Sequence, residues 1–150
     1  MKSTAIRKYI YIVIGIAIVI TAYFIMRPYT TSFKELVLDR VNINSISSIE
    51  IVKAEKSSDE EKKIVVTDRK EIENIMHGFA EVKLKESDFD NSGDSYWFYI
   101  KVDGYSRFGL QLNEQNQIHV FDRQRDDKYR SASYQITNDF NKDFIGNLFN

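Results

Sequence analysis

An apolar stretch near the N-terminus constrains this chain more than any other feature of its sequence. Positions 9 to 26 read YIYIVIGIAIVITAYFIM and carry no charge, whereas Lys2, Arg7 and Lys8 precede them and Arg27 follows. As an α-helix, a stretch of this length extends roughly 27 Å, close to the thickness of the hydrocarbon core of a bilayer. A helix also satisfies its own backbone hydrogen bonds in lipid. The sequence therefore predicts a transmembrane anchor at 9–26.

The charges that flank this anchor predict its orientation. Most of the basic residues lie on the N-terminal side, which favours a cytoplasmic tail at 1–8 and a C-terminal domain outside the cell membrane. A cleaved signal peptide is the alternative, but Thr21-Ala22-Tyr23 leads into Phe24-Ile25-Met26-Arg27, a poor cleavage site. We therefore expect an uncleaved single-pass anchor, with cleavage of a fraction of the chains left open.

Composition limits the functions of the remaining chain, which we divide into a linker at 27–32 and one domain at 33–150. Four of the 21 basic residues and none of the 22 acidic residues precede position 29, so the rest of the chain has a net charge of about −5. This balance argues against nucleic acid and against electrostatic docking on an anionic membrane. The absence of Cys excludes disulfides, thiol catalysis and Cys-ligated zinc, and it suits the envelope of a Gram-positive bacterium.

The hydrophobic periodicity beyond the linker alternates between strand and helix patterns. Ser32 to Glu35 and Asp68 to Glu71 match the capping box that begins a helix, and Asp103-Gly104 is typical of a hairpin turn. Strands are predicted at 46–54, 63–67, 82–87, 96–102, 105–112, 117–123 and 131–136, and helices at 33–40, from 68 to about 80, and from 138 onward. This order indicates an α+β domain, in which two or three helices pack mainly on one face of an antiparallel sheet.

The domain also resembles a known group of proteins. The elements that carry the likeness are Ser32-Phe33-Lys34-Glu35-Leu36, Ile46-x-x-Ile49-Glu50-Ile51, Val66-Thr67-Asp68 with Glu71-Ile72, a strand rich in Tyr and Phe, and Tyr134-x-Ile136 before a terminal helix. Together they span most of residues 32 to 150. They are similar to small membrane-anchored or lipid-modified extracytoplasmic proteins of Gram-positive bacteria, whose α+β domain has no known function. The resemblance implies location and fold, and it brings no catalytic residues.

Strand alternation predicts a candidate site on the outer face of the sheet. If alternate apolar residues of the three central strands point into the core, the residues between them point outward. This places Trp97, Tyr99, Arg107, His119, Phe121 and Arg123 on one surface. Aromatic side chains with basic neighbours suit a protein partner or a sugar ring. The alternative is that Trp97 and Phe121 are covered by the helix at 33–40 or by packing across strands.

Other motifs point to no catalytic residue, cofactor or metal. Asp88-x-Asp90-x-Ser92-Gly93-Asp94 matches the front of a calcium loop, but the twelfth position is Tyr99 instead of Glu, so a polar turn is the simpler interpretation. His77 and His119 lie far apart, without the spacing of metal ligands. The chain has neither a nucleophile elbow nor a phosphate-binding glycine loop.

These observations favour a membrane-anchored, non-enzymatic interaction domain. Two other functions stay open from the sequence. One is a cell-wall glycan-binding module that uses Trp97 and Tyr99 as stacking platforms. The other is an immunity or inhibitor protein that blocks an envelope-directed toxin or hydrolase, a class that suits a small acidic domain.

Overall fold

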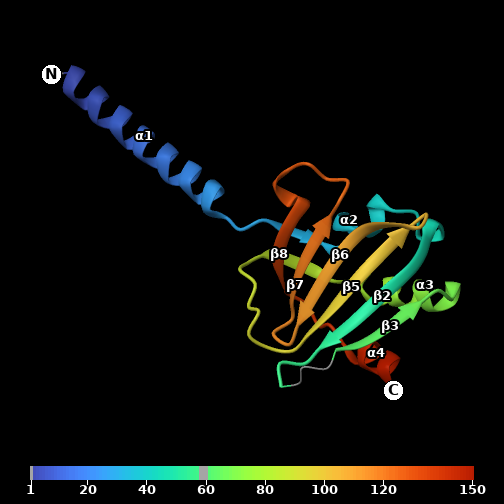
Figure 1. The fold of residues 1–150 in the computed structure, drawn as a ribbon. Coiled ribbons are helices and arrows are strands. Elements are labelled where there is room, and N and C mark those ends of the chain that lie inside the picture. The colour runs from blue at the N-terminus through green and yellow to red at the C-terminus, as the bar shows by residue number, and fades with distance from the viewer. Residues whose placement is uncertain (1, 58–60) are drawn as a thin grey trace.

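The N-terminal segment of the protein is a long helix that projects from the rest of the chain. In the computed structural model, residues 2–57 and 61–150 are described, with side chains from residue 8 onward. Helix α1 (Lys2–Met26) extends away from the domain, and none of its segment Lys8–Met26 is buried (Figure 1). That segment has a mean hydropathy of 2.4, so α1 is long and apolar enough to span a membrane.

The domain is built on one antiparallel sheet of eight strands (Figure 1). Its order is β1-β4-β8-β7-β6-β5-β2-β3. The strands are β1 (Thr30–Ser32), β2 (Ile46–Ala54), β3 (Lys62–Val66), β4 (Lys83–Glu86), β5 (Ser95–Val102), β6 (Tyr105–Asn113), β7 (Gln117–Asp122) and β8 (Ser131–Ile136). The predicted α+β class is confirmed. The segment 27–32 is only partly a linker, however, because Thr30 to Ser32 pair with Lys85 to Lys83 of β4.

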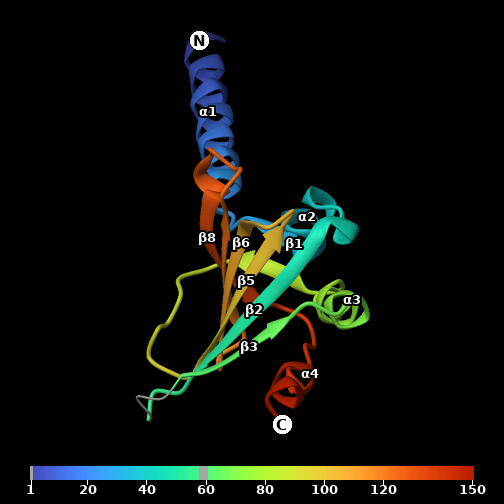
Figure 2. The same ribbon diagram turned by 45° about the vertical axis from the view of Figure 1, so that its right-hand side comes forward.

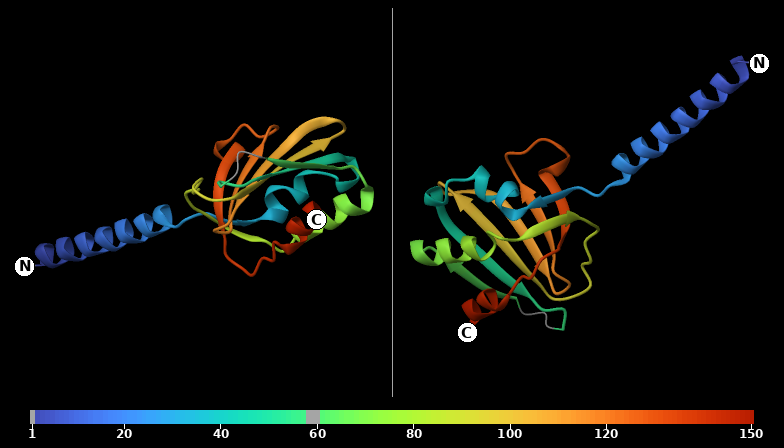
Figure 3. Two further views of the ribbon diagram at one scale, coloured as in Figure 1. Left: turned by 60° about the horizontal axis from the view of Figure 1, so that its bottom comes forward. Right: turned by 180° about the vertical axis from the view of Figure 1, so that it is seen from behind.

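Three short helices cover one face of this sheet, as Figures 2 and 3 show. They are α2 (Phe33–Leu36), α3 (Arg69–Gly78) and α4 (Asp143–Gly146). The core between helices and sheet is centred on Phe79, whose ring lies 4.9 Å from that of Phe33 and 5.5 Å from that of Phe98. Aromatic pairs at such distances add to the free energy of burial. We call the uncovered side of the sheet its outer face.

Local interactions explain where the helices begin and end. The Ser32 hydroxyl accepts a hydrogen bond from the Glu35 backbone amide, and Asp68 accepts one from that of Glu71, so both predicted caps are confirmed. The predicted helix at 33–40 divides into α2 and a 3-10 turn, η1 (Leu38–Arg40). The last helix begins later than predicted, because the Asn138 side chain instead hydrogen-bonds the backbone of Lys83 and Glu81.

Candidate functional site

Two rows of side chains cross the outer face of the sheet on neighbouring strands. Trp97, Gln111, His119 and Ser133 form the first row, since each pairs with the next across β5, β6, β7 and β8. Tyr99, Gly109, Phe121 and Ser131 form the second row in the same way. Residues that are directly opposite in adjacent strands bring their side chains into contact, so the rows make one continuous surface.

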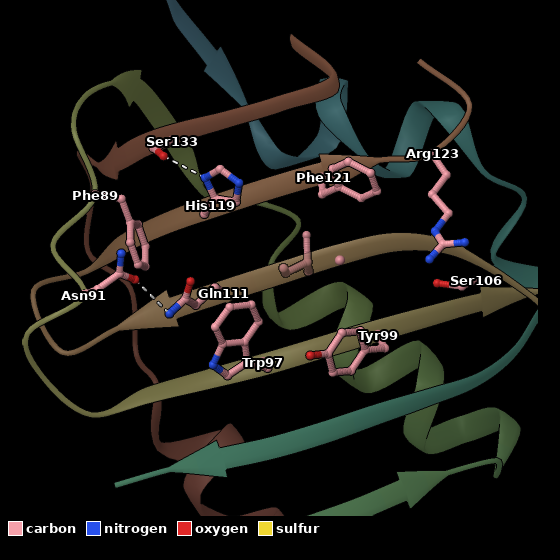
Figure 4. A pocket seen from close by; sticks show the side chains of 12 residues that line it. Phe89, Asn91, Trp97, Tyr99, Ser106, Gln111, His119, Phe121, Arg123 and Ser133 are labelled. Atoms are coloured by element: carbon pink, nitrogen blue, oxygen red, sulfur yellow. Dashed lines mark hydrogen bonds between the residues drawn. The ribbon is translucent and has the colours of Figure 1, made fainter. Parts of the chain in front are cut away.

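The second row is interrupted at Gly109, and a hollow results. Gly109 lies between Tyr99 and Phe121 and has no side chain to fill the space between their rings. The hollow has a volume of about 570 Å³. Figure 4 shows Phe89 and Asn91 at one end of it and Ser106 and Arg123 at the other. We call it the Gly109 hollow. Its size falls within the range of about 300–1,000 Å³ that is typical of small-molecule sites.

Aromatic rings form most of the apolar surface of the Gly109 hollow. The rings of Trp97 and Tyr99 lie nearly parallel, with 13° between their planes and 6.5 Å between their centres. Trp97 is half-buried, and Tyr99 is 38% exposed. Phe121 forms the opposite side, where the Arg130 guanidinium lies 5.6 Å from its ring centre. Phe89 meets His119 edge-on at 6.1 Å. The hollow thus presents several ring surfaces to solvent.

An amide pair supplies hydrogen-bonding groups at one end of the hollow. Gln111 is buried and donates a hydrogen bond from its side-chain nitrogen to Asn91 Oδ1 over 3.2 Å (Figure 4). Asn91 belongs to the loop 87–94, which Asn113 ties to the sheet by donating to the Asp90 carbonyl over 2.9 Å. Among the described residues, the Gln111 carbonyl oxygen and the Asn91 amide nitrogen make no hydrogen bond. Both groups are therefore available to a ligand.

His119 sits between two hydroxyl groups in the wall of the hollow. Its Nδ1 lies 2.7 Å from Ser133 Oγ, and its Nε2 lies 2.9 Å from Ser131 Oγ. Burial lowers the pKa of the His119 imidazole below its usual value, which favours the neutral ring. A neutral ring donates from one nitrogen and accepts at the other. The two serines thus hold the ring plane in place.

The structure corrects one predicted site residue, Arg107. A β-bulge shifts the register of β5 and β6, so that Lys101 pairs with Ser106 and Arg107 becomes the extra residue. Ser106 therefore takes the outer position. Arg107 is 7% exposed, and its guanidinium lies 3.4 Å from the Asp122 carboxylate, which also contacts Arg40 at 3.0 Å. Arg107 belongs to this ion-pair cluster and not to the candidate site.

The other five predicted residues come together on the outer face. Trp97, Tyr99, His119, Phe121 and Arg123 all line the Gly109 hollow. The alternative that the helix at 33–40 covers Trp97 and Phe121 is wrong, because α2 lies on the opposite face and inserts Phe33 into the core. Packing across the strands covers the two side chains only in part, since both are half-buried.

The acidic loop has the hydrogen bonds of a turn. Asp90 accepts from the Ser92 amide over 2.8 Å, and hydrogen bonds from the Ser92 side chain and then its backbone lower the pKa of the Asp90 carboxyl. Asp94 accepts from the Lys56 amide over 2.8 Å. Over residues 2–57 and 61–150, no group of three His, Cys, Asp or Glu side chains could hold a metal ion. His77 is exposed on α3, far from His119 in the sheet.

Several residues of the hollow are absent from the sequence-based prediction. Gly109 carried a usable signal, since a glycine inside a strand often marks a close approach of another group. Phe89 and Asn91 carried none, because their position depends on how the loop 87–94 crosses the sheet. Ser106 could not be assigned to the outer face from the sequence, because its position there depends on the β-bulge between β5 and β6.

Comparison with known proteins identifies no relative of this chain. A scan against protein families finds no matching family, and searches of curated proteins and of solved structures return no match. The resemblance to anchored Gram-positive proteins therefore stays a prediction.

Proposed function

We propose that this protein is a single-pass membrane protein that presents a non-enzymatic binding domain outside the cytoplasm. The observation that carries the proposal is the Gly109 hollow, an aromatic depression on the face of the sheet opposite α2, α3 and α4. Exposed apolar patches rimmed by polar groups are typical of binding sites. The ligand is recognised there.

The chemistry of the hollow supports binding more than catalysis. A serine nucleophile needs a base whose protonated form is stabilised, and in hydrolytic triads a carboxylate does this. In the described part of the chain, His119 is the only imidazole in the hollow, its nitrogens contact only the hydroxyls of Ser133 and Ser131, and no carboxylate is among the lining residues. Burial also lowers the pKa of His119, which disfavours the protonated ring. The aromatic rings and the Gln111–Asn91 pair instead provide a fixed surface with few degrees of freedom, which is what tight recognition requires.

The location in this proposal rests on α1 and on composition. The helix is long and apolar enough to span a membrane, and the basic residues at its N-terminal side favour a cytoplasmic N-terminus. The absence of Cys and the resemblance described above support a Gram-positive cell envelope. In that compartment, the hollow faces envelope proteins and cell-wall glycans.

Cross-linking capture from native membranes tests the function. The full-length protein is compared with Gly109→Val, which fills the hollow, and with Tyr105→Ala, which removes an aromatic ring that is 81% exposed outside it. Captured material is analysed for both protein and sugar. We expect material that the wild type and Tyr105→Ala capture and that a folded Gly109→Val variant loses. If all three capture the same material, or the wild type captures none, the proposal is wrong.

The inhibitor function is one outcome of this experiment. A toxin or hydrolase captured through the hollow would identify the domain as an immunity protein.

A further inference from the structure

We infer that the Gly109 hollow binds the pyranose ring of an uncharged oligosaccharide. The inference rests on the proposed function and names the class of its ligand. Three properties of the site carry it, namely the orientation of its aromatic rings, the type of its polar groups and its charge.

The aromatic rings match the apolar side of a sugar. In a pyranose, the C–H bonds of one side form a flat apolar patch, and their partial positive charge suits the negative face of an aromatic ring. Trp97 and Tyr99 offer such faces side by side, with only 13° between their planes. In Figure 4, both rings and that of Phe121 lie around the same hollow, and Gly109 is among the residues that line it. A ring-shaped ligand can therefore stack on β5 while its edge enters the hollow.

The polar groups match the hydroxyl groups around the same ring. The Gln111 carbonyl oxygen accepts a hydrogen bond and the Asn91 amide nitrogen donates one, so the pair can serve one hydroxyl or two neighbouring hydroxyls. Ser106 adds a hydroxyl at the other end of the hollow. A hydrocarbon ligand or an aliphatic side chain would cover the side-chain carbonyl oxygen of Gln111 without replacing its hydrogen bonds to water, which is unfavourable.

The charge of the hollow argues against strongly charged ligands. No carboxylate lines it, and Arg123 is the one cation among the lining residues that the structure describes. A cationic peptide would find no carboxylate among these lining residues, and a polyanion would find only Arg123 and the Arg130 guanidinium on the Phe121 ring. A neutral ligand with many hydroxyls uses the site without leaving a charge unpaired.

The protein carries its own reporter for this ligand. Trp97 is the only tryptophan in the chain, and it lines the hollow. The full-length protein is held in a detergent without a sugar headgroup, and its fluorescence is titrated with chitotriose and with cellotriose. We expect a saturable change in Trp97 emission below about 10 mM ligand. The comparison of the two sugars shows whether the acetamido group contributes.

Three variants make the titration specific. Gly109→Val fills the hollow, and Gln111→Leu removes the polar pair while keeping a side chain of similar size; we expect each to weaken binding roughly tenfold or more. Tyr105→Ala keeps the wild-type affinity, because Tyr105 lies outside the hollow. Thermal unfolding of each variant shows that it is folded, and Gln111→Leu still tests the site if Gly109→Val does not fold.

Two results would overturn the inference. One is the absence of any fluorescence change with both sugars at about 10 mM, and the other is equal affinity in the wild type and both hollow variants. If capture from membranes still depends on Gly109, the proposed function survives and its ligand is a protein surface. If capture fails as well, the proposed function falls with the inference.

Discussion

Replacement of Gly109 by alanine is expected to stabilise the fold. A glycine inside a strand destabilises it by about 0.5–1 kcal/mol relative to Ala, because its backbone loses more freedom on folding. A Cβ atom at this position would lie 3.8 Å from that of Phe121, an ordinary contact. We therefore expect Gly109→Ala to raise the free energy of unfolding by about 0.5–1 kcal/mol, measured by urea denaturation. A loss of stability would show that the backbone itself requires glycine.

Tyr134 is a second residue with a measurable signature. It is fully buried, and its hydroxyl has no hydrogen-bond partner among the described residues. Burial, the main cause, raises the pKa of Tyr134 from 10.0 to about 12. Because the unfolded state ionises first, stability is retained below pH 10 and falls as the pH rises toward 12, by about 2–3 kcal/mol.

The variant Tyr134→Phe should remove this loss. At pH 7 we expect it to be neutral or stabilising by about 1 kcal/mol, since an unpaired hydroxyl leaves the core. Denaturation measured from pH 8 to pH 12 should then show a constant difference in stability between the two proteins below pH 10 and a growing difference above it. Parallel curves over the whole range would show that Tyr134 does not control the alkaline transition.

At the scale of strands, alternation predicted most of the site, and one bulge limited it. The period of two in YWFYIKV and QIHVFD placed Trp97, Tyr99, His119 and Phe121 correctly, because each of these strands keeps its register on the outer face. The bulge next to Ser106 moved Arg107 to the other side. A bulge depends on how two strands pair, so the residues of one strand do not reveal it. Strand β1 was not predicted for the same reason, because it is a strand only through its pairing with β4, which its own three residues do not reveal.

The bulge creates an ion-pair cluster that should matter for stability. Asp122 is 2% exposed and contacts two guanidinium groups, those of Arg107 and Arg40. Removal of its carboxylate in Asp122→Ala leaves the buried Arg107 charge without its partner, which costs about 3–5 kcal/mol. Arg40→Ala is the matched control, because Arg40 is partly exposed and its loss leaves Asp122 paired with Arg107. Urea denaturation should therefore show a much smaller effect for Arg40→Ala. Equal effects would contradict this account.

At the scale of the whole molecule, the short segment between α1 and β1 keeps one end of the sheet close to the anchor. Only residues 27–29 separate α1 from β1, and these span at most about 11 Å. The Tyr29 ring lies 4.7 Å from that of Tyr129, in the connection between β7 and β8. This connection, residues 123–130, holds four basic and two acidic residues. The chain beyond the anchor has a net charge of about −5, but this connection, at the end of the domain next to α1, is basic.

If α1 spans a membrane, the connection 123–130 should lie at the lipid headgroups. A basic residue near an anionic surface gains about 1 kcal/mol, and tyrosine rings favour the interface. Because the protein has no Cys, a single spin label can be introduced by Asp126→Cys, or by Glu114→Cys at the opposite end of β7 as the control. In nanodiscs that contain anionic lipid and a nickel-chelating lipid, we expect faster relaxation of the label at position 126 than at position 114. The variant Tyr129→Ala should reduce this difference, because it removes the ring that packs on Tyr29. Equal relaxation at the two positions in the wild-type background would mean that the Tyr29–Tyr129 contact does not hold this end of the sheet toward the membrane.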